Sequence, residues 1–405
     1  MLKAIFRKKP LFFSILCIVL IFLTYLVYLE LKPTVARADQ DTNTLSSRVV
    51  PVEYPESVRR SQSMKAQEAR TTTNPWGIAL DEARGFVYVA EPGCEMSPYC
   101  KGPQSQQRVA FPGKIGKYSL ADGSFISDFT QPWHYSNPLF VVVNAADGHV
   151  WFTEPNSDAI GELNPDGERW WQTTVTANST PYDLVFDRRG NLWFTEFTGN
   201  RIGFLNLQTR QLVETTIPTA NSNPYGLTID QKGDLWFAEN APGVAKIGTF
   251  TPTTSGVISI REEVIDPSGA SQPHLITADP TDNIWFSEGF AGNIGKWDPV
   301  TRTATHYRVA VACRQAHMCT HLSGIYADKR GNIWFTDSLN ATVGYFMPPR
   351  GKYGGLIRVR PLSDGNAHPH DGLVVQSNGT VWFSEQYGTH SFGPALIMWP
   401  PGTMN

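Results

Sequence analysis

The sequence has few charged residues and no excess of positive charge. Only 18% of its 405 residues are Asp, Glu, Lys or Arg, and the formal net charge is -3. A nucleic-acid-binding protein presents a basic patch or stripe, and this chain shows no basic stripe with interleaved aromatic residues. We therefore exclude nucleic acid as a partner. The remaining composition, 41% hydrophobic and 12% aromatic, is that of a packed globular body.

One short pattern recurs along the chain. In residues 223–239, Leu227 to Asp230 alternates as a strand does, a Gly-bearing turn follows, and Leu235 to Glu239 forms a second strand. A period of about 40 to 50 residues with four short strands per unit predicts an all-β fold, a seven-bladed β-propeller. The aromatic marker of the seven repeats lies at Tyr88, Trp151, Trp193, Trp236, Trp285, Trp334 and Trp382.

The N-terminus predicts a membrane anchor. Residues 11–29 carry no charge and follow a cluster of basic residues, so they can span a bilayer with the basic flank in the cytoplasm. The rest of the chain would then be extracytoplasmic. Ala36-Arg37-Ala38 has the form of a signal-peptidase site, which leaves cleavage and secretion as the alternative. We expect an uncleaved anchor, because the apolar run is longer than a usual signal core.

These features divide the chain into three parts. Residues 1–32 are the cytoplasmic stub and transmembrane anchor, 33–46 a polar tether, and 47–405 the propeller. The last repeat is one strand short. We expect Arg48 to Tyr54 to form an N-terminal strand that supplies this missing outer edge and closes the ring.

Four cysteines occur as two pairs with the same spacing, Cys94 with Cys100 and Cys313 with Cys319. In an oxidising compartment such local pairs most simply form disulfides that staple two long loops, although four cysteines allow three connectivities. The second pair could instead bind zinc together with nearby histidines. We favour disulfides, because the first pair has no histidine inside it.

The histidines gather on one predicted face of the propeller. Loops from second to third strands, and loops between blades, emerge on the same face of the disc. His149 and His306 fall elsewhere. We therefore expect this face to be the working side. The histidines in or beside these loops are His134, His274, His317, His321, His368, His370 and His390.

A Pro-x-Gly-Leu pattern opens the innermost strands, and its second residue, here called the slot residue, points near the central channel. Aromatic slot residues would wall a pocket for a flat or apolar ligand. Because histidine titrates near working pH, His370 is a candidate general base, the alternative being a histidine that only bonds a neighbouring loop. The slot residues are Trp76, Leu139, Tyr182, Tyr225, His274, Ser323 and either His370 or Asp371.

An acidic residue closes the second strand of every repeat. Because each blade has one, we interpret these residues as structural. Glu385, beside the histidine-rich last blade, is retained as a functional candidate. The set is Glu91, Glu154, Glu196, Glu239, Glu288, Asp337 and Glu385.

Several motifs resemble one family. Trp193 to Glu196, followed by Asn200 to Gly203, and the Pro-Tyr-Gly-Leu at Pro224 are similar to segments of the virginiamycin B lyase, or streptogramin lyase, family. The resemblance implies a seven-bladed propeller that linearises a cyclic ester by magnesium-assisted elimination without water. In such a reaction a histidine takes the proton α to the carbonyl, and the metal stabilises the enolate.

The resemblance also implies site residues. Pro273-His274 matches the family's substrate-contacting segment, and His370 matches its base. The two magnesium carboxylates of the family correspond to His368 and to a position next to Glu385, so these two residues would form an altered magnesium site. We expect a monomer that acts on a small molecule, such as a cyclic peptide or ester. The alternative is a non-catalytic propeller that binds a ligand or protein at the cell surface.

Overall fold

The computed structural model describes residues 48–49, 52–53, 67–70, 75–92, 113–130, 137–309, 320–351, 355–362, 367–385 and 395–399. Every regular element in these ranges is a β-strand, and none of them contains a helix able to cross a bilayer. The predicted anchor at 11–29, the cleavage site, the tether and the four paired cysteines lie outside the described residues.

Twenty-seven of the strands build seven antiparallel sheets, and within each sheet consecutive strands are neighbours. From the innermost strand outward, the sheets are β4 (Ile78–Asp81), β5 (Phe86–Glu91), β6 (Lys114–Ser119) and β7 (Phe125–Thr130); β8 (Val141–Val143), β9 (Val150–Glu154), β10 (Ala159–Leu163) and β11 (Trp170–Thr174); β12 (Pro181–Phe186), β13 (Leu192–Glu196), β14 (Arg201–Leu205) and β15 (Leu212–Thr216); β16 (Pro224–Ile229), β17 (Leu235–Glu239), β18 (Lys246–Phe250) and β19 (Arg261–Val264); β20 (Ile276–Ala278), β21 (Ile284–Glu288), β22 (Asn293–Asp298) and β23 (Thr303–Arg308); β24 (Leu322–Ala327), β25 (Ile333–Asp337), β26 (Thr342–Met347) and β27 (Leu356–Pro361); and β28 (Pro369–Val375), β29 (Val381–Glu385) and β30 (Ala395–Trp399).

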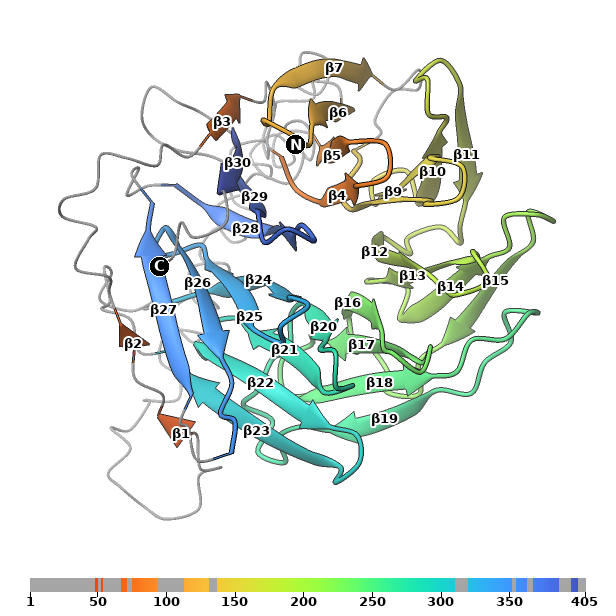
Figure 1. Ribbon diagram of the computed structural model, residues 1–405. Coiled ribbons are helices and arrows are strands. Elements are labelled where there is room, and N and C mark those ends of the chain that lie inside the picture. Colours follow the sequence, from red (N-terminus) through yellow and green to blue (C-terminus); the bar gives the residue numbers. More distant parts are fainter. Residues whose placement is uncertain are drawn as a thin grey trace, which may run out of the picture. The chain divides into compact units, whose positions relative to one another are not determined.

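The sheets are arranged as a closed ring (Figure 1). The innermost strand of each sheet contacts the innermost strand of the next, and β28 returns to contact β4. The aromatic marker of every repeat lies in the second strand of a sheet and is buried. Trp193, for example, packs with Leu227 and Leu235 of the following sheet. The expected all-β propeller is therefore confirmed.

The chain preceding the first sheet contributes three short strands. β3 (Gln67–Arg70) pairs antiparallel with β30 and completes the last sheet. β1 (Arg48–Val49) and β2 (Val52–Glu53) instead add parallel edges to β23 and β27. The strand expected at 48–54 therefore does not close the last sheet, and that assignment was wrong. Pro51 cannot donate a ladder hydrogen bond, which disfavours one continuous strand there.

Each regular repeat is fixed by an aspartate at the turn between its first two strands. Asp230 Oδ1 accepts hydrogen bonds from the backbone N–H groups of Lys232, Gly233 and Asp234, at 2.9 to 3.0 Å. Its Oδ2 accepts the indole N–H of Trp236 at 3.0 Å. Gly233 has a φ of 94°, a conformation that glycine adopts without strain. One carboxylate thus ties the turn to the buried tryptophan, as the equivalent bonds do at Asp187, Asp279 and Asp328.

The last sheet lacks this bond. Gln376 stands at the aspartate position, and neither its Oε1 nor the indole nitrogen of Trp382 has a hydrogen-bond partner although both atoms are buried. Unpaired buried polar groups lower stability.

This contrast predicts opposite effects of two substitutions. Asp230→Ala leaves the Trp236 indole and the turn amides unpaired, so we expect it to lower the free energy of unfolding by about 2 to 4 kcal/mol. Gln376→Asp supplies the missing acceptor and should raise it by about 1 kcal/mol. Denaturant unfolding of both variants and the parent chain measures the difference. Equal effects of the two substitutions would contradict this account of the turn.

Candidate functional site at the propeller axis

Hydrogen bonds between sheets fix the slot residues around the axis. Thr195 Oγ1 in β13 donates to the carbonyl of Tyr225 in the next sheet at 2.7 Å. In the same way Thr336 Oγ1 donates to the carbonyl of His370 at 2.6 Å. This equivalence places His370, rather than Asp371, in the slot. The additional residue lies in an irregular stretch of β28, where the pairing register shifts between Pro369 and Leu373.

The extra residue, Asp371, is the central acceptor of the site. Its Oδ2 accepts hydrogen bonds from Trp76 Nε1 at 3.1 Å and from the Tyr225 hydroxyl at 2.8 Å. Its Oδ1 lies 3.2 Å from His274 Nε2 and 2.9 Å from His370 Nδ1. Burial would raise the pKa of Asp371, but the neighbouring His370 and His274 hold this pKa well below its usual range. A buried carboxylate therefore joins residues of four sheets.

His370 approaches this carboxylate closely but outside hydrogen-bonding geometry. Its Nδ1 is 2.9 Å from Asp371 Oδ1, yet the same Nδ1 is a buried atom without a hydrogen-bond partner. The His370 side chain is 12% exposed, and its ring lies 5.1 Å from that of Trp76. A small rotation of the ring would turn this approach into a hydrogen bond and leave Nε2 as the working nitrogen.

The tyrosines predicted to wall a ligand pocket pack against each other. Tyr182 and Tyr225 have ring centroids 4.1 Å apart, and their hydroxyls are joined by a hydrogen bond. Tyr225 also stacks on His274 at 3.9 Å. Burial, followed by the charge of Asp371, raises the pKa of both hydroxyls well above the usual value, so both stay neutral. Their contact with a ligand stays a prediction.

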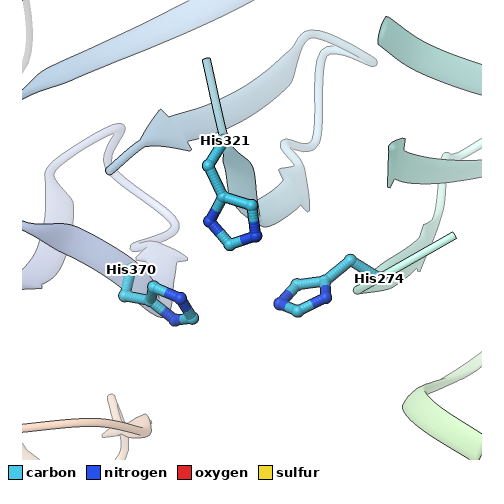
Figure 2. Close-up of side chains that lie close together, drawn as sticks. All are labelled: His274, His321 and His370. Carbon is cyan, nitrogen blue, oxygen red and sulfur yellow. The ribbon is translucent and has the colours of Figure 1, made fainter. Parts of the chain in front are cut away.

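His321 is the member of the site that sequence analysis missed. Figure 2 shows its ring converging with those of His274 and His370, and one ligand atom from each ring lies within 4.8 Å of the other two. The Nδ1 of His321 is 3.0 Å from the hydroxyls of Ser338 and Ser323. Burial, followed by the charges of His274 and His370, lowers the pKa of His321 to about 2. The recurrence of these histidines about one repeat apart was the available signal.

The predicted magnesium residues lie at the same end of the last sheet. The His368 ring stacks on that of His370 at 5.3 Å, and Glu385 pairs with Pro369 in the ladder. Burial, followed by the charge of His370, lowers the pKa of His368 to about 3. Magnesium prefers oxygen ligands, so the three converging imidazoles do not fit it. Magnesium at His368 and Glu385 stays a prediction.

The acidic residues at the second-strand ends serve their own sheets. Asp337 accepts hydrogen bonds from the Thr320 hydroxyl at 2.6 Å and from the backbone N–H of His321 at 3.1 Å, and so holds His321 at the axis. Burial, together with the charge of Glu262, raises the pKa of Glu239 to about 8. Burial also raises the pKa of Glu196 to about 7.

These raised values predict a pH-dependent stability. Between pH 5 and 8 folded Glu239 retains a proton that the unfolded chain has lost, so the free energy of unfolding falls as pH rises through this window. Glu239→Gln removes the effect, and the variant should gain stability relative to the parent chain from pH 5 to pH 9. For Glu196→Gln the gain should level off near pH 7. Denaturant unfolding at each pH measures it, and two variants with flat profiles would contradict the prediction.

The fold and site define a propeller whose axis, at one end, is lined by histidines around a buried carboxylate. The model of the Virginiamycin B lyase family matches residues 106–322, just over half of the chain, and the protein belongs to this family. No curated protein matches the sequence.

Solved structures support the same fold. Virginiamycin B lyase from Staphylococcus aureus is 24% identical, with a TM-score of 0.65, and the alignment covers 83% of this chain and 99% of that one. A catalytically inactive histidine-to-alanine variant of that enzyme, solved with quinupristin, is 25% identical with the same coverage and TM-score. A streptogramin B lyase is 24% identical, with a TM-score of 0.66 and 83% and 97% coverage.

Proposed function

We propose that the protein is a lyase that opens a cyclic ester by elimination, with His370 as the general base. The observation that carries the proposal is the position of His370, whose backbone is fixed in the slot while its ring lies 2.9 Å from a fully buried carboxylate. In the related enzyme from Staphylococcus aureus, replacement of one histidine by alanine gives a catalytically inactive protein, which was solved with quinupristin.

The proposed reaction is a proton transfer coupled to bond cleavage. A neutral His370 takes the proton from the carbon α to a carbonyl, the electron pair of that C–H bond forms a C=C bond, and the ester C–O bond breaks with departure of a carboxylate. No water is consumed. The protonated imidazole is stabilised by the negative charge of Asp371, which Trp76 and Tyr225 hold in place.

The remaining groups of the site favour a ligand with an apolar part. Phe290 is 61% exposed, and its ring lies 4.4 Å from that of His321. Asn240 Nδ2 is 3.3 Å from His274 Nδ1, which orients His274 as a substrate contact. A small cyclic peptide or ester fits this combination of an apolar rim and imidazole donors. We also propose that the chain acts as a monomer outside the cytoplasm, tethered by residues 11–29.

The test is turnover of quinupristin by the parent chain and by His370→Ala. We expect turnover to fall by about 100-fold or more, because a general base contributes on the order of 10² to 10⁴ to the rate. Mass spectrometry should show a linear product with the mass of the cyclic substrate, whereas hydrolysis would add a water.

His149→Gln is the matched control. His149 contacts Glu162 on a different part of the ring, away from the axis, so this variant should keep parental turnover. The melting temperature of His370→Ala should stay close to that of the parent chain. Parental turnover in His370→Ala would refute the base assignment. Binding of quinupristin without any turnover in the parent chain would favour the non-catalytic binding function.

A further inference from the structure

The three histidine rings at the axis form a compact group. His274, His321 and His370 come from three consecutive sheets, those of β20, β24 and β28. Their ring centroids are 5.3 to 5.9 Å apart, and one nitrogen of each ring lies within 4.8 Å of the other two. Nitrogens bound to one tetrahedral zinc ion are roughly 3.4 Å apart, since each Zn–N bond is about 2.0 to 2.1 Å. Modest side-chain rotation closes the difference.

We propose that His274, His321 and His370 bind one divalent transition-metal ion of the zinc type. The donor set is three imidazoles, which suits zinc, cobalt, nickel or copper rather than magnesium or calcium. Three histidines from the protein also leave one coordination position of a tetrahedral ion open.

Neighbouring side chains already orient two of these rings as ligands. The Ser338 and Ser323 hydroxyls lie 3.0 Å from His321 Nδ1, so its Nε2 is the nitrogen available to an ion. Asp371 faces His370 Nδ1 in the same way, which makes Nε2 the ligand atom there too. Carboxylates and hydroxyls behind metal-bound imidazoles are the usual means of fixing ring orientation.

The third ring has to exchange one partner. His274 Nε2 lies 3.2 Å from Asp371 Oδ1, and its Nδ1 lies 3.3 Å from Asn240 Nδ2. Binding through Nε2 replaces the contact with Asp371 by the ion, while Asn240 stays behind Nδ1. Asp371 keeps Trp76 and Tyr225 as donors, and its charge then partly offsets that of the ion.

Metal binding has a consequence for catalysis that rests on the proposed function. The Nε2 of His370 cannot hold an ion and accept a substrate proton at once. Zinc and substrate therefore compete for one nitrogen, and the ion acts as a reversible inhibitor of the lyase.

The experiment measures metal binding directly, on the full-length chain purified in detergent and stripped with a chelator. We expect one Co²⁺ per chain with the visible absorption of a tetrahedral nitrogen site, no thiolate charge-transfer band, and displacement by Zn²⁺. His321→Gln should weaken Co²⁺ binding by about 10- to 100-fold or more, and His149→Gln should not change it. Mg²⁺ at the same concentration should not displace Co²⁺.

Two results would overturn the inference: no stoichiometric Co²⁺, or binding that His321→Gln leaves unchanged. Adding Zn²⁺ to an active parent chain should lower turnover, and the chelator should restore it. Stoichiometric binding that depends on His321, in a chain without turnover, would support the metal site and count against the proposed lyase. Turnover without metal binding would do the reverse.

Discussion

The hydrogen bond between a second-strand hydroxyl and the slot carbonyl of the next sheet is the constraint on which the site depends. It recurs between several pairs of sheets, as from Thr195 to Tyr225 and from Ser384 to Trp76. The strands also approach so closely that a Cβ on Gly226 would lie 2.7 Å from the backbone of Leu275. Glycine permits the approach and the hydroxyl fixes its register. The side chains that meet at the axis are therefore held by backbone geometry.

The axis combines one buried charge with several groups that can answer it. A carboxylate removed from water is costly unless it is paired and hydrogen-bonded. Asp371 meets this requirement with two neutral donors, Trp76 and Tyr225, and two imidazoles. The imidazoles are the only partners in this group whose charge can change within the ordinary pH range. The same carboxylate can therefore stabilise a proton taken from a substrate or the positive charge of an ion.

Much of the fold could be predicted from the sequence, because the repeat carries its own turn chemistry. Asp230, Gly233 and Trp236 recur in the same order, and the structure shows that they are bonded to one another. The closing strand could not be predicted. Gln67–Arg70 has no apolar alternation, since its role is to pair with an exposed edge.

The site was predictable only in part. His274 and His370 were identified from their positions in the repeat, and they lie 5.9 Å apart between ring centroids. His321 precedes its slot, which Ser323 occupies, so a search restricted to slot residues overlooks it. The role of Asp371 depends on a one-residue irregularity in β28, and hydrophobic periodicity does not reveal such an irregularity. The last sheet also draws its strands from both ends of the chain: β28, β29 and β30 come from the C-terminal part and β3 from the N-terminal part. On a ribosome the ring must therefore stay open until nearly all of the chain has emerged, and His370 meets its partners only at that final closure. A product of premature termination would present His274 and the tyrosines but no complete site, so assembly of the histidine group reports that synthesis has finished.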